Sequence, residues 1–90
     1  MNYRCVLPEA LKTVASQFLE FANGGAQATV ELKDGRVFPR ALISNSSAIV
    51  ALRGFDSPPF GSDQIARVYQ TEDDANPEER DGWRYWDNWA

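Results

Sequence analysis

Arginine and aromatic side chains are the residue types in this chain best suited to binding. Arginine carries a planar set of hydrogen-bond donors, and aromatic rings offer faces for stacking. Interleaved arginines and rings are typical of surfaces that hold single-stranded RNA, because arginines contact phosphates and rings stack on bases. The candidate RNA-binding residues are Arg36, Phe38, Arg40, Arg53 and Arg67.

A second aromatic group lies near the C-terminus and contains every tryptophan of the chain. Trp83, Trp86 and Trp89 are spaced by three residues, so one short helical turn would align them, and Tyr85 lies between them. Large aromatic residues dominate the energetics of protein interfaces. Two interpretations remain open: these rings complete the core of their own domain, or they insert into another subunit or a protein partner.

Phe55 and Phe60 flank a stiff segment that contains Pro58 and Pro59. Proline fixes its own φ and pushes the preceding residue to an extended conformation. The segment could be a rigid aromatic binding loop, in which case Phe55 and Phe60 would contact a partner. It could also be a lid whose two rings plug an open end of the sheet, and we favour the lid.

The residue types present argue against an enzyme. The chain has no histidine, which excludes a Ser-His-Asp triad, a Cys-His pair and the usual zinc sites. Cys5 is the single cysteine, so we expect a buried spectator thiol and no internal disulfide. The carboxylate pairs Asp73-Asp74 and Glu78-Glu79 lie in a charged, apolar-poor segment where acid-base pairs are poorly fixed. We therefore expect no catalytic residue, no metal site and no cofactor.

Charge is unevenly distributed along the chain. The net charge is −4, yet residues 1–70 carry seven basic and six acidic residues, whereas residues 71–90 carry two basic and seven acidic residues. This change predicts a folded domain over residues 1–70 and an acidic, Trp-rich C-terminal segment over residues 71–90. Residues 71–80 are poor in apolar side chains and indicate a linker or a frayed segment.

The centre of the chain, residues 28–43, predicts a β-hairpin. Asp34-Gly35 suits a two-residue type I′ turn, which would pair Leu32 with Val37 and place Phe38 opposite Glu31. Pro39 cannot donate a hydrogen bond, so its amide must face an edge or a bulge. In this register one face is apolar and consists of Ala28, Val30, Leu32, Val37, Pro39 and Ala41.

The flanking elements complete a small fold. Apolar residues at helical spacing (Leu7, Leu11, Val14, Phe18 and Phe21) predict a helix over residues 7–22, ended by Gly24 or Gly25. A turn at residues 44–47, a third strand at 48–53, a loop at 54–63 and a fourth strand at 64–70 follow. The predicted fold class is α+β and mainly β: an N-terminal helix, then a strongly bent antiparallel meander of four to five strands.

This order resembles the Sm-like small barrels over roughly residues 8–70. Leu32-Lys33-Asp34-Gly35 looks like the hairpin of the Sm motif, and Ser62-Asp63-Gln64-Ile65 looks like its second half. Arg40 stands where the family usually has glycine, and residues 44–47 lack the Asp and Asn that hold RNA bases. Similar hairpins occur in SH3-like barrels. The helix placement and the acidic balance also resemble Rho-binding antitermination proteins, a branch that binds a protein instead of RNA.

Two functions follow as hypotheses. The first is a small non-enzymatic protein-binding, inhibitory or regulatory module that uses a barrel surface and its acidic aromatic tail, with a basic or nucleic-acid-binding protein as partner. The alternative is an Sm-like protein that binds single-stranded RNA, as a homo-oligomeric ring. The apolar runs are shorter than the ~20 residues of a membrane span, and the N-terminus lacks a signal-peptide core. We therefore expect no membrane partner and a cytoplasmic location.

Overall fold

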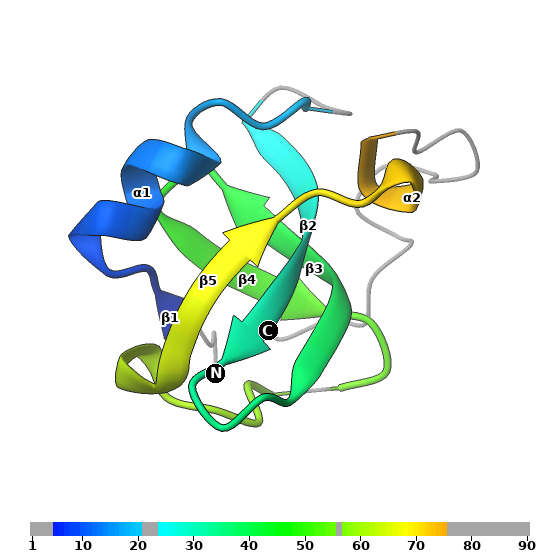
Figure 1. Cartoon of the computed structure of the whole chain (residues 1–90). Coiled ribbons are helices and arrows are strands. Elements are labelled where there is room, and N and C mark those ends of the chain that lie inside the picture. The colour runs from blue at the N-terminus through cyan, green and yellow to red at the C-terminus, as the bar shows by residue number, and fades with distance from the viewer. Residues whose placement is uncertain (1–4, 21–23, 56, 76–90) are drawn as a thin grey trace.

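The computed structural model describes residues 5–20, 24–55 and 57–75, which form a curled, five-stranded antiparallel sheet flanked by short helices (Figure 1). The sheet has the strand order β1-β4-β3-β2-β5 and curls into a half-barrel. This arrangement confirms the predicted class, α+β and mainly β. The elements in chain order are β1 (Cys5–Val6), α1 (Glu9–Ala15), β2 (Gly25–Leu32), β3 (Val37–Ser44), β4 (Ala48–Leu52), the 3₁₀ turn η1 (Ser62–Gln64), β5 (Ile65–Tyr69) and α2 (Glu72–Ala75).

Helix α1 is shorter than the predicted helix over residues 7–22. It begins after Pro8, whose carbonyl accepts hydrogen bonds from the amides of Leu11 and Lys12. It ends at Ala15, after which the amides of Gln17 and Phe18 bond the carbonyls three residues earlier, those of Val14 and Ala15. The side chain of Gln70 bonds both backbone groups of Leu19, at 2.9 Å and 3.0 Å. Those bonds replace the helical bond that the Leu19 amide would otherwise make.

The apolar stripe of the N-terminal region is only partly directed to the core. Leu7 is buried, and Leu11 and Phe18 pack against the core, as predicted. Val14 was predicted on the same stripe but is 42% exposed. The predicted stripe member Phe21 lies outside the described residues.

The hairpin between β2 and β3 forms at the predicted place with a different turn. The carbonyl of Leu32 accepts a hydrogen bond from the amide of Gly35, and the amide of Leu32 donates to the carbonyl of Arg36. These bonds close a three-residue loop in which Gly35 has φ +94°. This is a type I turn followed by a left-handed residue in a bulge, so the predicted type I′ turn at Asp34-Gly35 is wrong. The register next to the turn is shifted by one residue, and Glu31 pairs with Val37 instead of Phe38.

A β-bulge in the middle of β3 restores the predicted register. Ala28 pairs with Ala41 and Val30 pairs with Phe38, so Pro39 and Arg40 together oppose the single residue between them on β2. Arg40 adopts φ +60°, a left-handed conformation. Pro39 therefore lies in a bulge, one of the two places expected for it, where its missing amide hydrogen breaks no regular ladder bond.

The consequence of the shifted register is an exchange of faces in the first half of β3. Val37, predicted on the buried face, is 49% exposed, whereas Phe38 packs against the core. Pro39, also predicted on that face, is exposed. Beyond the bulge, Ala41 and Ile43 return to the core side as predicted.

The type I′ geometry occurs at the next hairpin instead. Asn45 and Ser46 adopt φ +51° and +60°, and the amide of Ser47 bonds the carbonyl of Ser44. The predicted turn at residues 44–47 is therefore confirmed. Gly24 lies beside this turn at φ +79°, and a Cβ there would come within 2.6 Å of the Asn45 side chain. The absence of a side chain at Gly24 thus allows the Asn45 side chain to lie close to the backbone. The predicted role of Gly24 or Gly25 as a helix cap is wrong.

The core lies on the concave side of the sheet, beneath α1. A bulge between β2 and β5 turns both Ile65 and Val68 inward, whereas the alternation in the sequence placed Ile65 with Arg67. Leu42 and Ala51 are buried on the opposite face, which agrees with the expectation that the third strand is covered on both sides. The main buried cluster consists of Cys5, Leu7, Ala15, Ala28, Val30, Leu32, Ala41, Ile43, Ile49, Leu52, Phe60, Ile65 and Val68.

Candidate binding groove

Helix α2 is fixed by a reciprocal cap at its start. The Thr71 amide donates to the Asp74 carboxylate at 2.9 Å, and the Asp74 amide donates to the Thr71 hydroxyl at 3.2 Å. This pattern is a capping box, which satisfies two otherwise unpaired helix donors. Three acidic residues lie in the first turn of α2, where their negative charge interacts favourably with the positive N-terminal end of the helix dipole.

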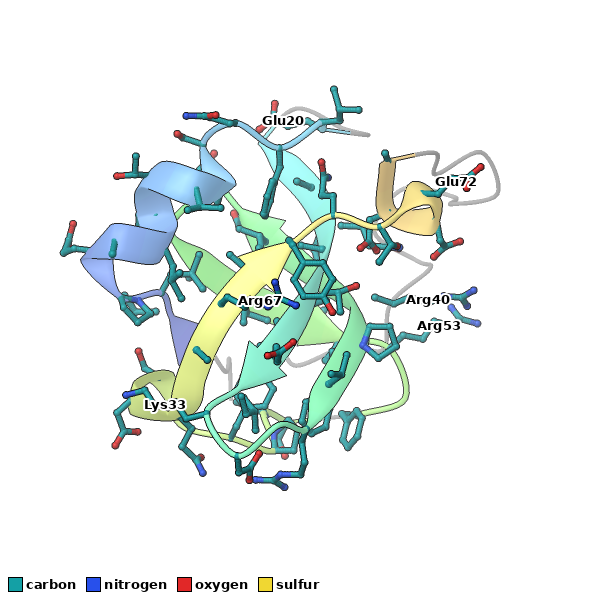
Figure 2. All side chains as sticks on the ribbon, viewed as in Figure 1. Glu20, Lys33, Arg40, Arg53, Arg67 and Glu72 are labelled. Atoms are coloured by element: carbon teal, nitrogen blue, oxygen red, sulfur yellow. The ribbon has the colours of Figure 1, made fainter. Side chains whose placement is uncertain are left out.

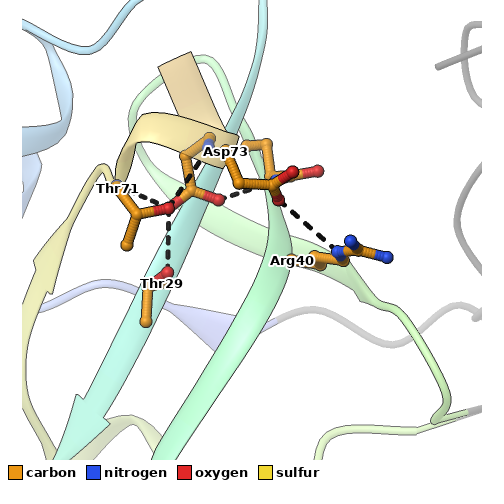
Figure 3. A network of polar contacts seen from close by, with 6 residues as sticks. Thr29, Arg40, Thr71 and Asp73 are labelled. Atoms are coloured by element: carbon orange, nitrogen blue, oxygen red, sulfur yellow. Dashed lines mark hydrogen bonds and ion pairs between the residues drawn. The ribbon is translucent and has the colours of Figure 1, made fainter. Parts of the chain in front are cut away.

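The same carboxylate joins α2 to the outer face of β2, as Figure 3 shows. Asp74 is 2% exposed and accepts hydrogen bonds from the Gln27 amide at 2.6 Å and the Thr29 hydroxyl at 2.8 Å. A buried carboxylate is stable when hydrogen bonds replace its lost water. The predicted linker or frayed segment is therefore wrong for residues 71–75, which are packed on the sheet.

Beside this contact lies an open groove of about 750 Å³, which we name the β3 groove. Its floor and walls come from β2, β3, β5 and the segments that follow β4 and β5. The apolar and aromatic residues of its lining are Val37, Phe38, Pro39, Phe55 and Tyr69. The polar residues of the lining are Thr29, Arg40, Arg53, Thr71 and Asp73.

Two arginines reach the groove because a backbone hydrogen bond joins their positions. The Arg53 amide donates to the carbonyl of Arg40 at 3.1 Å, across the bulge of β3. Figure 2 shows both side chains extended in the same direction, away from the sheet. Asp73 faces them from α2, with its carboxylate 3.5 Å from Nε of Arg40 (Figure 3). Both of these side chains are about half exposed, so their ion pair adds little stability and water reaches it.

Three of the five phenylalanines, Phe38, Phe55 and Phe60, divide between groove and core. Phe38 lies between the other two rings, with centroids 5.7 Å from Phe55 and 5.2 Å from Phe60. Phe60 is 7% exposed and belongs to the core, whereas Phe55 is 38% exposed and lines the groove. The two rings that were expected to act together thus lie in different environments. The edge contact with Phe38 holds the Phe55 ring in place at the groove wall.

The other two arginines that the sequence singled out lie at the margins of the groove. Arg67 places its guanidinium 4.5 Å from the ring centroid of Tyr69 and pairs with Glu31 at 3.0 Å. Arg36 lies 6.0 Å from the Phe38 ring and bonds the Asp34 carboxylate at 2.8 Å. Both arginines therefore contact a groove residue, while a carboxylate of their own offsets each charge.

Asp34 and Cys5 have shifted pKa values. The backbone amide of Arg36 donates to the carboxylate of Asp34 at 3.0 Å and, with the Arg36 side chain, lowers the pKa of Asp34. Burial raises the pKa of the Cys5 thiol, so this cysteine is a weak nucleophile.

No protein family, curated protein or solved structure matches this chain. Within residues 5–20, 24–55 and 57–75, no three potential metal-ligating side chains lie close enough to hold an ion. No helix among these residues has the length and apolar character needed to cross a membrane.

The sequence indicated only part of the groove. Phe38, Arg40, Arg53 and Phe55 were singled out and lie together, whereas Trp83, Tyr85, Trp86 and Trp89 lie outside the described residues. Tyr69, Val37 and Asp73 were missed. One signal for the α2 side was available, because Thr71-Glu72-Asp73-Asp74 has the spacing of a capping box.

Proposed function

We propose that this chain is a small protein-binding module whose binding surface is the β3 groove. The observation that carries the proposal is the pairing of Arg40 and Arg53 through their backbones, beside the exposed ring of Phe55. Arginine and aromatic residues are enriched in the energetic centres of protein interfaces. A groove of about 750 Å³ is also in the range of concave binding sites.

The chemistry of the groove favours an extended polypeptide that carries both acidic and aromatic side chains. Two guanidinium groups on one rim offer bidentate sites for carboxylates. The opposite wall offers Phe55, Tyr69 and Val37 as apolar contacts. Because Phe38 and the bulge fix this wall before a partner arrives, little ordering is required on binding.

Single-stranded RNA is the second candidate, supported by the same arginines and by the guanidinium stacked on Tyr69. Two carboxylates count against it. Asp73 lines the groove and Glu31 pairs with Arg67, and they repel a backbone with a phosphate at every nucleotide more than a peptide whose few carboxylates can lie beside Arg40 and Arg53. Seven basic residues against six acidic ones in residues 1–70 also supply little long-range attraction for phosphates.

For the fold family, we propose an Sm-like or SH3-like small barrel. The supporting features are an N-terminal helix, a strongly curled antiparallel sheet and a tight turn at Asp34-Gly35. The ring of copies expected for an Sm-like protein follows from the same proposal. Light scattering on a sizing column tests it, since a monomer at micromolar concentration would count against a ring.

The binding proposal is tested by fluorescence anisotropy on the full chain. The probes are a short labelled peptide of alternating glutamate and tryptophan, a matched peptide with lysine in place of glutamate, and labelled oligouridylate. We expect the acidic peptide to bind and the basic peptide not to bind. The combined variant Arg40→Ala and Arg53→Ala should lower the affinity for the acidic peptide by about tenfold or more, which corresponds to about 1.4 kcal/mol of binding free energy.

A charge-matched control separates the groove from general electrostatics. Lys12→Ala combined with Lys33→Ala removes two positive charges at positions outside the groove lining. This control should bind the acidic peptide with an affinity within about twofold of the wild-type value, because exposed charges at a distance are screened by salt. Equal losses in both variants would contradict the groove, and tighter binding of oligouridylate than of the acidic peptide would favour RNA.

A further inference from the structure

We propose that residues 76–90 bind in the β3 groove of their own chain and compete there with the partner. The inference rests on the proposed function of the groove and names its first occupant. It makes the acidic, tryptophan-rich segment a built-in competitor, so that a partner binds only by displacing it.

The path of the chain leads to the groove. Asp74 ties α2 to Gln27 and Thr29 on β2, and the preceding residue, Asp73, lines the groove itself. Helix α2 ends at Ala75, two residues after the groove residue Asp73. Fifteen extended residues span up to roughly 50 Å, which is more than enough to follow the groove within one molecule.

The charges of the two surfaces are complementary. Residues 76–90 contain four acidic residues, Glu78, Glu79, Asp81 and Asp87, against two arginines. On the groove side, Arg40 and Arg53 project together from one rim. Carboxylates of the segment therefore meet guanidinium groups in a groove that the body positions in advance.

The apolar surfaces are complementary as well. Val37 is 49% exposed and Phe55 is 38% exposed, and both line the groove. The segment supplies Trp83, Trp86 and Trp89, the largest apolar side chains of the chain. Tryptophan against a ring or a guanidinium gains from stacking and cation–π contacts, as Arg67 already does with Tyr69 at 4.5 Å.

Covalent attachment makes a weak contact effective. A tethered segment with a short linker has an effective concentration in the millimolar range. If it fills the groove nine-tenths of the time, the apparent affinity of a partner falls by about tenfold. The affinity that a partner needs is then set by the tail as well as by the groove.

Tryptophan fluorescence tests the inference directly, because every tryptophan of the chain lies in this segment. We expect the full chain to show a blue-shifted emission and weak quenching by acrylamide. Arg40→Ala combined with Arg53→Ala should shift the emission to the red and raise the quenching constant about twofold or more. The charge-matched control, Lys12→Ala with Lys33→Ala, should leave both quantities unchanged. Far-UV circular dichroism identifies any variant that fails to fold, and Phe55→Ala provides a second groove variant.

Identical emission in the wild-type, groove and control chains would overturn the inference. A shift of the wild-type emission to the red on dilution would also overturn it, because the segment would then bind a second copy. These outcomes do not depend on any partner peptide.

Titration with the acidic peptide separates the inference from the proposed function. The full chain with Trp83→Ala, Trp86→Ala and Trp89→Ala should bind the peptide about tenfold more tightly than the wild type, which supports self-occupancy. Equal affinity that still depends on Arg40 and Arg53 would overturn the inference and leave the groove function intact. Absence of binding in both chains would overturn the proposed function, and with it the competitive role of the segment.

Discussion

The two halves of strand β3 differ in burial. Residues 37–40 are exposed or half-buried and line the β3 groove, whereas Ala41, Leu42 and Ile43 are at most 2% exposed. Both halves are rich in apolar residues. The bulge at Pro39 and Arg40 separates the two halves, because it changes the register by one residue and leaves only Phe38 of the first half against the core.

The comparison shows that one strand can serve two purposes when a bulge divides it. The second half is held by the core and fixes the sheet. In the first half only Phe38 packs against the core, and Val37, Phe38 and Arg40 line the groove. A similar division separates two neighbouring carboxylates, since Asp74 is buried in hydrogen bonds while Asp73 is half exposed in the groove.

Truncating one side chain in each half of β3 should give the largest difference in the free energy of unfolding. Ile43→Ala should lower the free energy of unfolding by about 2–5 kcal/mol, because it leaves a cavity in the core. Val37→Ala should cost less than about 1 kcal/mol, because half of that side chain already contacts water. Urea denaturation measures both, and equal costs would contradict the assignment of the two halves.

The next largest difference in stability is expected between substitutions of the adjacent carboxylates Asp74 and Asp73. Asp74→Asn places an amide donor among three donors, from Gln27, Thr29 and Thr71, and should cost about 1–3 kcal/mol. Asp73→Asn is the matched control and should cost less than Asp74→Asn, since the Asp73 side chain is half exposed, with an exposed ion pair to Arg40 and a hydrogen bond from the Gln27 amide at 3.1 Å. Hydrogen exchange of residues 71–75 should rise in the first variant alone. Similar unfolding curves for both variants would refute the structural role of Asp74.

Glycine substitutions should distinguish the two groove arginines. Arg40 has φ +60°, so Arg40→Gly relieves a left-handed strain and should keep stability or raise it by up to about 1 kcal/mol. Arg53 is not in that conformation, so Arg53→Gly should destabilise by about 0.5–1 kcal/mol. Thermal denaturation compares the two. A larger loss for Arg40→Gly would contradict the bulge geometry.

The smallest effect is expected at the hairpin tip, where Asp34 titrates. Its folded-state pKa is lowered, so the carboxylate adds stability above its unfolded pKa of about 4, and this contribution is lost as the pH falls through the lower, folded value. An NMR titration of the Asp34 carboxyl should show a midpoint below that of an unfolded peptide. Arg36→Lys should keep most of the shift, because the first cause is the backbone amide of residue 36. An unshifted midpoint would contradict this bond.

The fold class could be predicted from the sequence, and most of the elements could be placed. The Asp34-Gly35 hairpin, the turn at residues 44–47 and the two later strands have strong local signals. The bulges could not be predicted, because periodicity assumes a continuous strand and a single extra residue exchanges the faces. The course of the chain after α1 was missed for another reason, since the backbone of Leu19 bonds the side chain of Gln70, far away in the sequence.

Several residues of the groove could be predicted individually from the sequence, but their arrangement in space could not. Arg40, Arg53 and Phe55 stood out by type, yet no local pattern indicates that Arg53 bonds the backbone of Arg40. Asp73 was assigned to a solvated run because the acidic composition outweighed the capping box that begins at Thr71. Long-range pairing decided the first case and is not encoded in the spacing of residues along the chain, whereas the capping box was a local signal that the sequence did contain.

The most direct measurement is an NMR map of the peptide-binding surface on the full chain. The ¹⁵N-labelled chain would be titrated with the peptide of alternating glutamate and tryptophan. We expect the largest amide shifts at Val37, Arg40, Arg53, Phe55 and Tyr69, with little change at Val6 and Val14, which are exposed but lie outside the groove. Shifts centred on Val6 or Val14, or saturating binding that leaves the groove amides unmoved, would contradict the β3 groove as the binding surface.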